Sequence, residues 1–184
     1  YKPCGGEIAE NKLIFTGLCG MKDGLKDGVE TAVAECRRAG VSTVMITGDH
    51  VRTAFSIAKK LGIAESMDEV MTGAELDAIP KAKRGAAIEK CRVFARVSPK
   101  HKNIIVNALQ KKGHVVAMTG DGINDAPSIK SADIGISMGI SGTDVTKSAS
   151  DMVISDDNFA TIVSAVREGR RLSENIKKTI RFFV

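Results

Sequence analysis

Residues 116–127 read VAMTGDGINDAP: an apolar, strand-like run, a turn with two glycines and two aspartates, and then Pro127. Proline is tolerated in the first turn of a helix, so a short helix is predicted over residues 126–131. A related corner, VMITGDH, occupies residues 44–50 and again joins an apolar run to a helical pattern. Strands that lead into helices favour a parallel sheet, whose ligands bind beyond the carboxyl ends of the strands. The two Thr-Gly-Asp corners are therefore predicted to lie at the same edge of one sheet.

Apolar runs of strand length alternate with helical periodicity along the rest of the chain. We predict strands at residues 13–18, 43–46, 93–95, 114–118, 134–136 and 152–154. We predict helices at residues 29–36, 51–61, 72–76, 81–90, 102–110, 126–131, 143–149 and 159–184. The predicted fold class is α/β, with a Rossmann-like parallel sheet that carries helices on both faces.

The composition is that of a globular chain long enough to bury a core. Of its 184 residues, 43% are apolar and 27% are charged, which excludes a disordered or fibrous chain. No apolar run approaches the roughly 20 residues of a membrane span, and no secretory signal opens the chain. Because the chain begins at Tyr1 rather than Met, we expect it to be a piece of a longer protein.

Charge and residue usage narrow the classes of ligand. A net charge of +5 favours an anionic ligand such as phosphate. Aromatic residues make up only 4%, with no Trp, so few platforms exist for stacked bases and no nucleic-acid partner is expected. The four cysteines lack CxxC spacing, which disfavours a zinc site or a disulfide framework and favours a reducing, cytosolic setting. Cys36 and Cys91 are predicted to be small core residues.

The turn after residue 118 holds the strongest candidate for a metal site. Asp121 and Asp125 stand four residues apart across a glycine-rich corner, so their carboxylates could converge. Mg²⁺ is usually bound by one or two carboxylates together with waters and phosphate oxygens. The alternative is an Asp/Gly-rich turn that caps a helix. The ordered run of turn and acidic residues favours the metal site.

Two further features suit a phosphoryl group. The Thr47 hydroxyl and the Gly48 backbone N–H, at a strand end, can both donate to a phosphoryl oxygen. The alternative is a helix N-cap formed by Thr47 or Asp49. A lysine in the run Pro99–Lys102 could neutralise phosphate, although basic residues on a solvated face are common.

Together these motifs resemble the phosphorylation domain of P-type cation-transporting ATPases, which belong to the haloacid dehalogenase-like superfamily. The resemblance covers nearly the whole chain, with the motifs in family order. They include FTGLCGMKDGLKDGV at 15–29, MITGD at 45–49, FARVSPKHK at 94–102 and TGDGINDAPSIKSADIGISMG at 119–139. The segment SGTDVTKSASDMVISDDNFATIVSAVREGR at 141–170 resembles the end of that domain, and the final LSENIKKTIRFFV a cytoplasmic stalk helix.

The resemblance assigns roles to the first corner and its neighbours. It implies that Thr47 and Gly48 bond the transferred phosphoryl group, and that Asp49 and Arg96 lie near the nucleotide and the hinge. It also implies ATP and Mg²⁺ as cofactors of the intact protein.

The resemblance assigns the remaining roles to the second corner. Lys102, selected over Lys100 by its spacing to Asp121, would pair with the phosphoryl group. Asp121 would coordinate Mg²⁺, while Asn124 and Asp125 would hold the phosphoryl group and the metal shell in place. Lys and Mg²⁺ would neutralise charge that develops on the phosphoryl group, while hydroxyl and amide donors position it.

Two departures from the family pattern matter. The chain contains no Asp-Lys-Thr-Gly-Thr motif, which supplies the family's nucleophilic aspartate on a central strand of the sheet. We therefore expect residues 1–171 to be a partial phosphorylation domain, 172–184 to begin the stalk helix, and the isolated chain to lack ATPase activity. At the hinge, Asp23-Gly24-Leu25-Lys26 replaces the more common Asp-Pro-Pro-Arg, which affects the expected stiffness of the hinge.

The resemblance implies a membrane-embedded parent protein, with this soluble piece on the cytoplasmic face. The transported cation is expected to be calcium, because the segment after residue 138 looks most like calcium and sodium/potassium pumps. Two alternatives stay open: a soluble haloacid dehalogenase-like phosphatase with its own nucleophile, and a Mg²⁺-binding receiver-like module. A sheet edge left open by the missing strand predicts a possible homodimer of the fragment.

Overall fold

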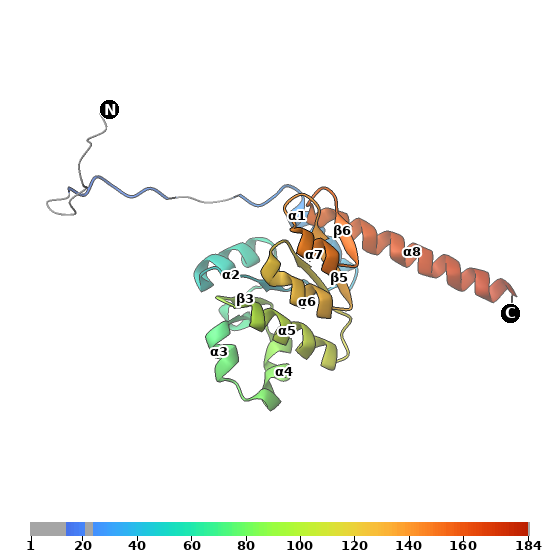
Figure 1. Cartoon of the computed structure of the whole chain (residues 1–184), viewed down its shortest axis with the longest axis horizontal. Coiled ribbons are helices and arrows are strands. Elements are labelled where there is room, and N and C mark those ends of the chain that lie inside the picture. Colours follow the sequence, from blue (N-terminus) through green and yellow to red (C-terminus); the bar gives the residue numbers. More distant parts are fainter. Residues whose placement is uncertain (1–13, 21–23, 184) are drawn as a thin grey trace.

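The computed structural model describes residues 14–20 and 24–183, which alternate between helices and parallel strands (Figure 1). The strands are β1 (Met45–Ile46), β2 (Val70–Thr72), β3 (Val93–Ala95), β4 (Ala117–Gly120), β5 (Ile134–Met138) and β6 (Met152–Ile154). The helices are α1 (Val29–Arg38), α2 (Val51–Lys60), α3 (Gly73–Ala78), α4 (Lys81–Lys90), α5 (Pro99–Lys111), α6 (Ala126–Ser131), α7 (Asp144–Ala149) and α8 (Phe159–Phe183). Two 3₁₀ turns, Met67–Glu69 and Ile123–Asp125, precede β2 and α6.

The strands form two three-stranded parallel sheets rather than the single sheet predicted. The first has the order β1-β3-β2, and the second has the order β4-β5-β6. Among the described residues, β1 pairs only with β3 and β4 only with β5. The parallel α/β class is confirmed, whereas the expected continuity of one sheet is wrong for the described strands. Strand pairing is a long-range property that periodicity along the chain does not encode.

Alternating side chains of β3 place helices on both faces of the first sheet. Val93 and Ala95 pack with α1 and α2 in one core cluster. Phe94 points the other way and packs with α3, α4 and α5. All three side chains are fully buried, as expected for a central strand of a parallel sheet.

The second sheet is covered in the same way. Met118 of β4 packs with Val106 of α5 and Ile129 of α6. Ile136 of β5 packs with Ile162 near the start of α8, on a separate core cluster. The predicted helices on both faces are therefore confirmed.

Local signals in the sequence set several helix ends. Thr72 and Glu75 form a capping box that begins α3, and Ser98 and His101 form another at the start of α5. Gly62 follows Leu61, the C-cap of α2, and has φ +66°, a left-handed conformation that favours glycine.

The predicted strand at residues 13–18 is wrong over residues 14–18, and Leu13 lies outside the described residues. Ile14, Phe15 and Leu18 are exposed and unpaired, because strand propensity forms a strand only where a neighbouring edge is available. The strand predicted at 114–118 begins later, at Ala117. Conversely, β2 is absent from the predicted strands, because three residues within an irregular stretch give no clear period.

Cys36 and Cys91 are buried among apolar side chains, as predicted. Burial raises the pKa of both thiols, so they behave as packing residues. Cys4 and Asp23 lie outside the described residues.

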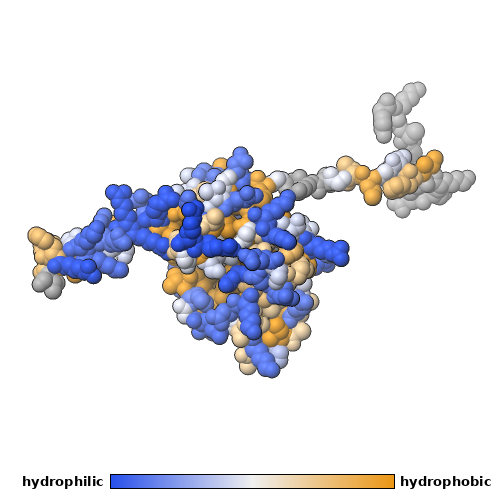
Figure 2. All heavy atoms as spheres, turned by 180° about the vertical axis from the view of Figure 1, so that it is seen from behind, coloured by the Kyte–Doolittle hydropathy of each residue, from blue (hydrophilic) through white to orange (hydrophobic). Residues whose placement is uncertain are grey.

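Helix α8 is continuous through Leu172 and extends away from the two sheets (Figure 1). Its side chains are exposed from residue 171 to residue 183. On the face shown in Figure 2, polar residues cover most of its projecting length. Its exposed apolar side chains are Leu172, Ile176, Ile180, Phe182 and Phe183. Within the described residues, no helix combines the length and apolarity needed to cross a membrane.

Candidate active site

The two Thr-Gly-Asp corners leave strands that share one core cluster. Ile46, directly before the first corner, packs against the cluster that contains Met118, directly before Thr119. Both corners follow the carboxyl ends of their strands, where parallel sheets bind ligands. The structure therefore brings the ends of β1 and β4 to neighbouring positions, although they belong to separate sheets.

Lys102 and Asp125 are candidate residues from different elements whose side chains meet. The Lys102 ammonium, from the first turn of α5, donates to Asp125 Oδ1 at the start of α6. Asp125 is only 7% exposed, and a buried carboxylate needs such a partner. The contact joins residues 23 apart in the chain, so α5 and α6 are fixed to one another at the site.

Gly120 is required for this arrangement. A Cβ added to Gly120 would lie 2.6 Å from Asp125 Cβ and 2.7 Å from Asp125 Oδ2. Real Cβ atoms do not approach other atoms so closely. The glycine therefore allows the Asp125 carboxylate to fold back against the end of β4.

Asp121 presents a different environment from Asp125. Its backbone carbonyl accepts hydrogen bonds from Thr143 N at 3.1 Å and Thr146 Oγ1 at 3.4 Å, which fix the turn against α7. Its side chain is exposed, and its carboxylate makes no hydrogen bond among the described residues. Asn124 is also exposed on the following 3₁₀ turn.

The first corner is held by its own hydrogen bonds. Thr47 Oγ1 donates to Asp49 Oδ2 at 2.9 Å and accepts from Asp49 N at 3.1 Å. Gly48 is exposed, with open space where a Cβ would lie. The space beside Gly48 is therefore open to a phosphoryl oxygen. The Thr47 hydroxyl can donate to such an oxygen only after its hydrogen bond to Asp49 breaks.

Backbone hydrogen bonds from the residues that follow β3 also hold this corner. Arg96 N donates to Asp49 O at 3.1 Å, and Val97 N donates to Thr47 O at 3.3 Å. Arg96 has φ +49°, an unusual conformation for a residue other than glycine. Its side chain is exposed, so it is available to a ligand near the corner.

The donor set fits Mg²⁺. Asp121 offers exposed carboxylate oxygens, and one or two carboxylates with waters and phosphate oxygens satisfy that ion. Residues 14–20 and 24–183 contain no group of three or more His, Cys, Asp or Glu side chains that could hold a metal ion without a ligand. A magnesium ion would therefore be shared between Asp121, water and a phosphoryl group, and the individual site roles stay predictions.

Sequence reasoning missed residues that support the site without touching a ligand. Thr146 is fully buried and reaches the Asp121 carbonyl, yet a threonine in a helical pattern carries no distinct signal. His101 stands next to Lys102 in a basic run, which gives it no role of its own. It stands three residues after Ser98, at the N3 position of a capping box, but the sequence signature has Glu or Gln there and so does not identify a histidine.

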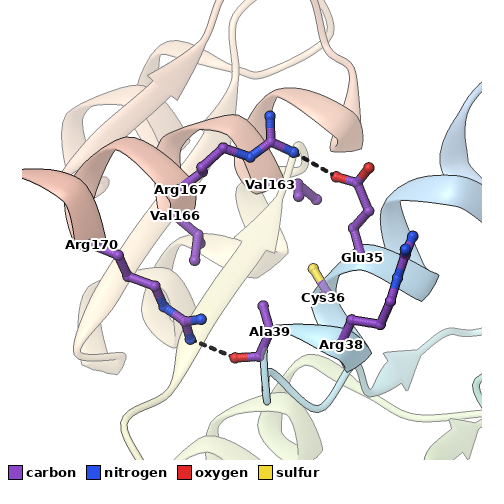
Figure 3. Close-up of a pocket in the computed structure, with 8 residues that line it drawn as sticks. All are labelled: Glu35, Cys36, Arg38, Ala39, Val163, Val166, Arg167 and Arg170. Atoms are coloured by element: carbon purple, nitrogen blue, oxygen red, sulfur yellow. Dashed lines mark hydrogen bonds and ion pairs between the residues drawn. The ribbon is translucent and has the colours of Figure 1, made fainter.

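A cavity of about 400 Å³ lies elsewhere, between α1 and α8 (Figure 3). Arg167 donates to Glu35 Oε2 at 2.9 Å and Arg170 donates to Ala39 O at 2.6 Å across it. None of the candidate site residues lines this cavity. Its contacts join the start of α8 to α1 and are structural.

A protein-family model for haloacid dehalogenase-like hydrolases matches residues 6–133, well over half of the chain. The chain belongs to the haloacid dehalogenase-like hydrolase family. The α/β fold described above is thus the haloacid dehalogenase-like fold, as the motifs at residues 44–50 and 116–127 predicted.

Relatives of this haloacid dehalogenase-like chain are named as calcium-transporting ATPases. Calcium-transporting ATPase 1 of Bacillus cereus is 57% identical over 175 residues, which is 95% of this chain and 20% of that protein. The calcium-transporting ATPase of Bacillus subtilis is 54% identical over 97% of this chain and 20% of its own length. The predicted similarity to cation-transporting ATPases is confirmed, and the chain spans about a fifth of these relatives.

Solved structures agree with the family. A zinc-transporting PIB-type ATPase superimposes with a TM-score of 0.66 and 31% identity, over 86% of this chain and 21% of that chain. The catalytic domain of a CPx-ATPase superimposes with a TM-score of 0.56 over 76% of this chain and 44% of that chain. At 22% identity, the second likeness supports the fold alone.

Proposed function

We propose that this chain is part of the phosphorylation domain of an ATP-driven cation pump. The observation that carries the proposal is the Lys102–Asp125 ion pair, because Asp125 lies on the same turn after β4 as the exposed side chain of Asp121. A cation and an exposed carboxylate at one strand end suit a phosphoryl group and its metal. The similarity to calcium-transporting ATPases over 95% of the chain supports the same interpretation.

The proposed reaction has two steps and uses an aspartate outside these 184 residues. The aspartate oxygen attacks the γ-phosphorus of ATP, the bond to the β-phosphate oxygen breaks, and ADP leaves. Water then attacks the phosphorus of the aspartyl phosphate, the bond to the aspartate oxygen breaks, and phosphate leaves. When bound, Mg²⁺ supplies charge neutralisation at the transferred phosphoryl group.

The residues of this chain would position and neutralise the phosphoryl group. Gly48 N–H and the Thr47 hydroxyl donate to its oxygens, once Thr47 releases Asp49. Lys102 places a positive charge against it while Asp125 holds the Lys102 ammonium. Asn124, exposed on the same turn, adds a neutral amide donor. Donors that are already oriented, such as Gly48 N–H and Lys102, would lower the barrier because little solvent must reorganise around the transferred group.

The domain assignment follows from the same proposal. Residues 1–171 form the partial phosphorylation domain, and residues 172–184 begin a stalk helix that leads towards a membrane. The exposed side chains of α8 after residue 171 support this division. Asp49 and Arg96 are the proposed contacts to the nucleotide, and the parent protein would carry this domain on the cytoplasmic side.

The proposed cation is calcium, because several relatives are named as calcium-transporting ATPases. The residues that select a cation are not assigned to this chain. Calcium therefore rests on similarity, whereas the phosphoryl chemistry rests also on Lys102, Asp121 and Asp125.

The first test reads the encoding gene on both sides of this stretch. The proposal expects an Asp-Lys-Thr-Gly-Thr motif upstream and apolar stretches of about 20 residues on both sides. A start codon directly before Tyr1 and a stop codon directly after Val184 would contradict it.

The second test uses the longer protein with γ-labelled ATP and Mg²⁺. We expect a hydroxylamine-labile label that requires calcium and is reduced in a Lys102→Ala variant. A label that requires another cation would reject calcium alone. The 184-residue chain by itself should release no phosphate above background, and release that an Asp121→Asn variant abolishes would contradict that expectation.

A further inference from the structure

We propose that His101 is a positioning residue that holds Lys102 in place through a bridge to Asp77 of α3. The inference rests on the proposed function only for the role of Lys102, which is to pair with a phosphoryl group. The bridge itself is a matter of geometry in the described residues.

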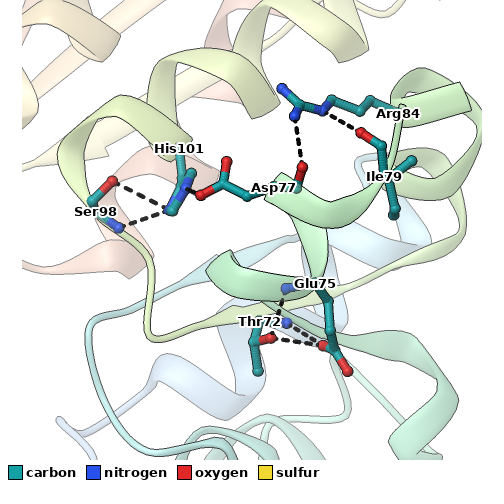
Figure 4. A network of polar contacts seen from close by, with 7 residues as sticks. All are labelled: Thr72, Glu75, Asp77, Ile79, Arg84, Ser98 and His101. Atoms are coloured by element: carbon teal, nitrogen blue, oxygen red, sulfur yellow. Dashed lines mark hydrogen bonds and ion pairs between the residues drawn. The ribbon is translucent and has the colours of Figure 1, made fainter. Parts of the chain in front are cut away.

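Both ring nitrogens of His101 are engaged (Figure 4). Ser98 N donates to Nδ1 at 3.0 Å, and because an amide N–H can only donate, Nδ1 carries no proton. The proton of the neutral ring therefore lies on Nε2, which faces Asp77 Oδ2 at 3.0 Å. The Ser98 hydroxyl also lies 3.2 Å from Nδ1.

Asp77 is a fixed partner because α3 is held at both ends. At its start, Thr72 and Glu75 exchange hydrogen bonds, with Thr72 N to Glu75 Oε2 at 2.7 Å. At its end, Arg84 of α4 donates to Asp77 O at 3.0 Å and to Ile79 O at 2.8 Å (Figure 4). The Asp77 carboxylate that contacts His101 therefore belongs to a helix that is held at both ends and has little freedom to rotate.

The imidazole is also packed tightly. A Cβ added to Gly73 would lie 2.6 Å from His101 Cε1 and 2.8 Å from Arg96 O, so only glycine allows α3 to approach this closely. The His101 side chain is 12% exposed, although Asp77 is 61% exposed. Steric contact and two hydrogen bonds therefore fix the same ring.

This bridge acts on the segment that joins the two halves of the candidate site. The backbone N–H groups of Arg96 and Val97 donate to the first corner. The Lys102 ammonium donates to Asp125 in the second corner. His101 lies between these points, in the first turn of α5. A shift of that turn would move the Lys102 ammonium, and small displacements of a charged group at a reaction site are costly.

The experiment measures acetylation of Lys102 by limiting N-hydroxysuccinimide acetate, quantified by mass spectrometry. Lys100, exposed in the same helical turn, is the internal reference. His101→Leu keeps an apolar body of similar size and removes both ring bonds. His101→Gln can keep both, because its amide oxygen accepts from Ser98 N while its NH₂ donates to Asp77.

In the wild type, Lys102 should react more slowly than Lys100. His101→Leu should raise Lys102 acetylation roughly tenfold, the size expected for loss of a charge-assisted hydrogen bond, and His101→Gln should restore it. Asp77→Ala should also raise Lys102 acetylation. Because Asp77 is exposed, this variant provides the test if His101→Leu does not fold. The matched control is Glu89→Ala, which removes the carboxylate partner of the other paired histidine, His114.

The inference is overturned if Asp77→Ala leaves Lys102 acetylation unchanged, if His101→Gln matches His101→Leu, or if Glu89→Ala has the same effect as Asp77→Ala. Adding inorganic phosphate with Mg²⁺ to the wild type separates this inference from the proposed function. If phosphate and Mg²⁺ do not slow the acetylation of Lys102 further, the proposed phosphoryl site is contradicted. The positioning of Lys102 by His101 is unaffected by that result.

Discussion

Gly120 shows how one small residue controls the candidate site. Its missing side chain leaves the space in which the Asp125 carboxylate turns back to meet Lys102. Gly48, in the matching position of the first corner, has no neighbour within 4 Å of the same point. The two corners therefore share a sequence pattern but use their glycines differently.

Gly120→Ala should lower the free energy of unfolding by about 1–3 kcal/mol, because the added Cβ overpacks against Asp125. Gly48→Ala should leave it within about 0.5 kcal/mol of wild type, since open space surrounds that position. Urea unfolding of both variants checks the pair. Equal stabilities for the two variants would contradict the packing seen at Gly120.

Asp157 holds the loop that follows β5. Its carboxylate accepts hydrogen bonds from Ile140 N at 2.9 Å and Ser141 N at 2.7 Å. These backbone bonds to the charged form lower the pKa of Asp157 from 3.8 to about 2. The residue has φ +50°, which Asp and Asn tolerate better than most side chains.

Because its pKa is lowered in the folded state, Asp157 stabilises the fold fully above the unfolded pKa of 3.8. That stabilisation should disappear as the pH falls towards about 2. Asp157→Asn keeps the size and the backbone preference but removes the charge, so it should be less stable than wild type at neutral pH. Unfolding measured over this range should show the difference shrinking below about pH 4. A difference that is constant with pH would contradict the assignment.

At the scale of elements, α8 has two parts with different roles. Ile162 and Val163 are buried against the second sheet and α1, respectively, and Arg167 and Arg170 reach across to α1. The side chains beyond residue 170 are exposed. The start of the helix thus belongs to the domain core, and the rest projects from it.

Removal of residues 172–184 should change the free energy of unfolding by no more than about 0.5 kcal/mol, because the described part of that segment buries no side chain. Ile162→Ala, in the packed part, should cost about 2–4 kcal/mol. Thermal or urea unfolding compares the two. A large loss on truncation would place the domain boundary later than residue 171.

At the scale of the whole molecule, the two sheets each leave one inner edge without a described partner. β1 pairs with β3 and β4 pairs with β5, while Ile46 packs against the cluster of Met118. The edges of β1 and β4 therefore lie near each other. We expect that, in a longer protein, an additional strand between them joins both sheets and ends at the edge that carries Thr47 and Asp121.

A peptide with an apolar strand followed by Asp-Lys-Thr-Gly-Thr should bind between these edges. Amide chemical shifts should change at residues 45–46 and 117–120, and a scrambled peptide of the same composition should cause no change. Shifts confined to the outer strands β2 or β6 would contradict this placement.

A homodimer through the same open edges stays a prediction. Light scattering of the chain alone should then give twice the single-chain mass, and the peptide should reduce it to one. A single-chain mass without peptide would reject the dimer.

The sequence by itself determined most of the helices and strands, though not β2, and the order of the motifs along the chain. Residues 93–95, 126–131 and 152–154 match β3, α6 and β6, because period, proline and capping signals act between near neighbours in the chain. The two Thr-Gly-Asp corners, with a lysine before the second, also indicated the family.

The tertiary structure decided how distant segments meet. It split the strands into two sheets, left residues 14–18 unpaired, and turned Asp125 towards Lys102 while Asp121 stayed exposed. It also placed His101 against Asp77 and Gly73. Pairing edges and close approaches depend on which surfaces become neighbours on folding, and local periodicity carries no information about that choice.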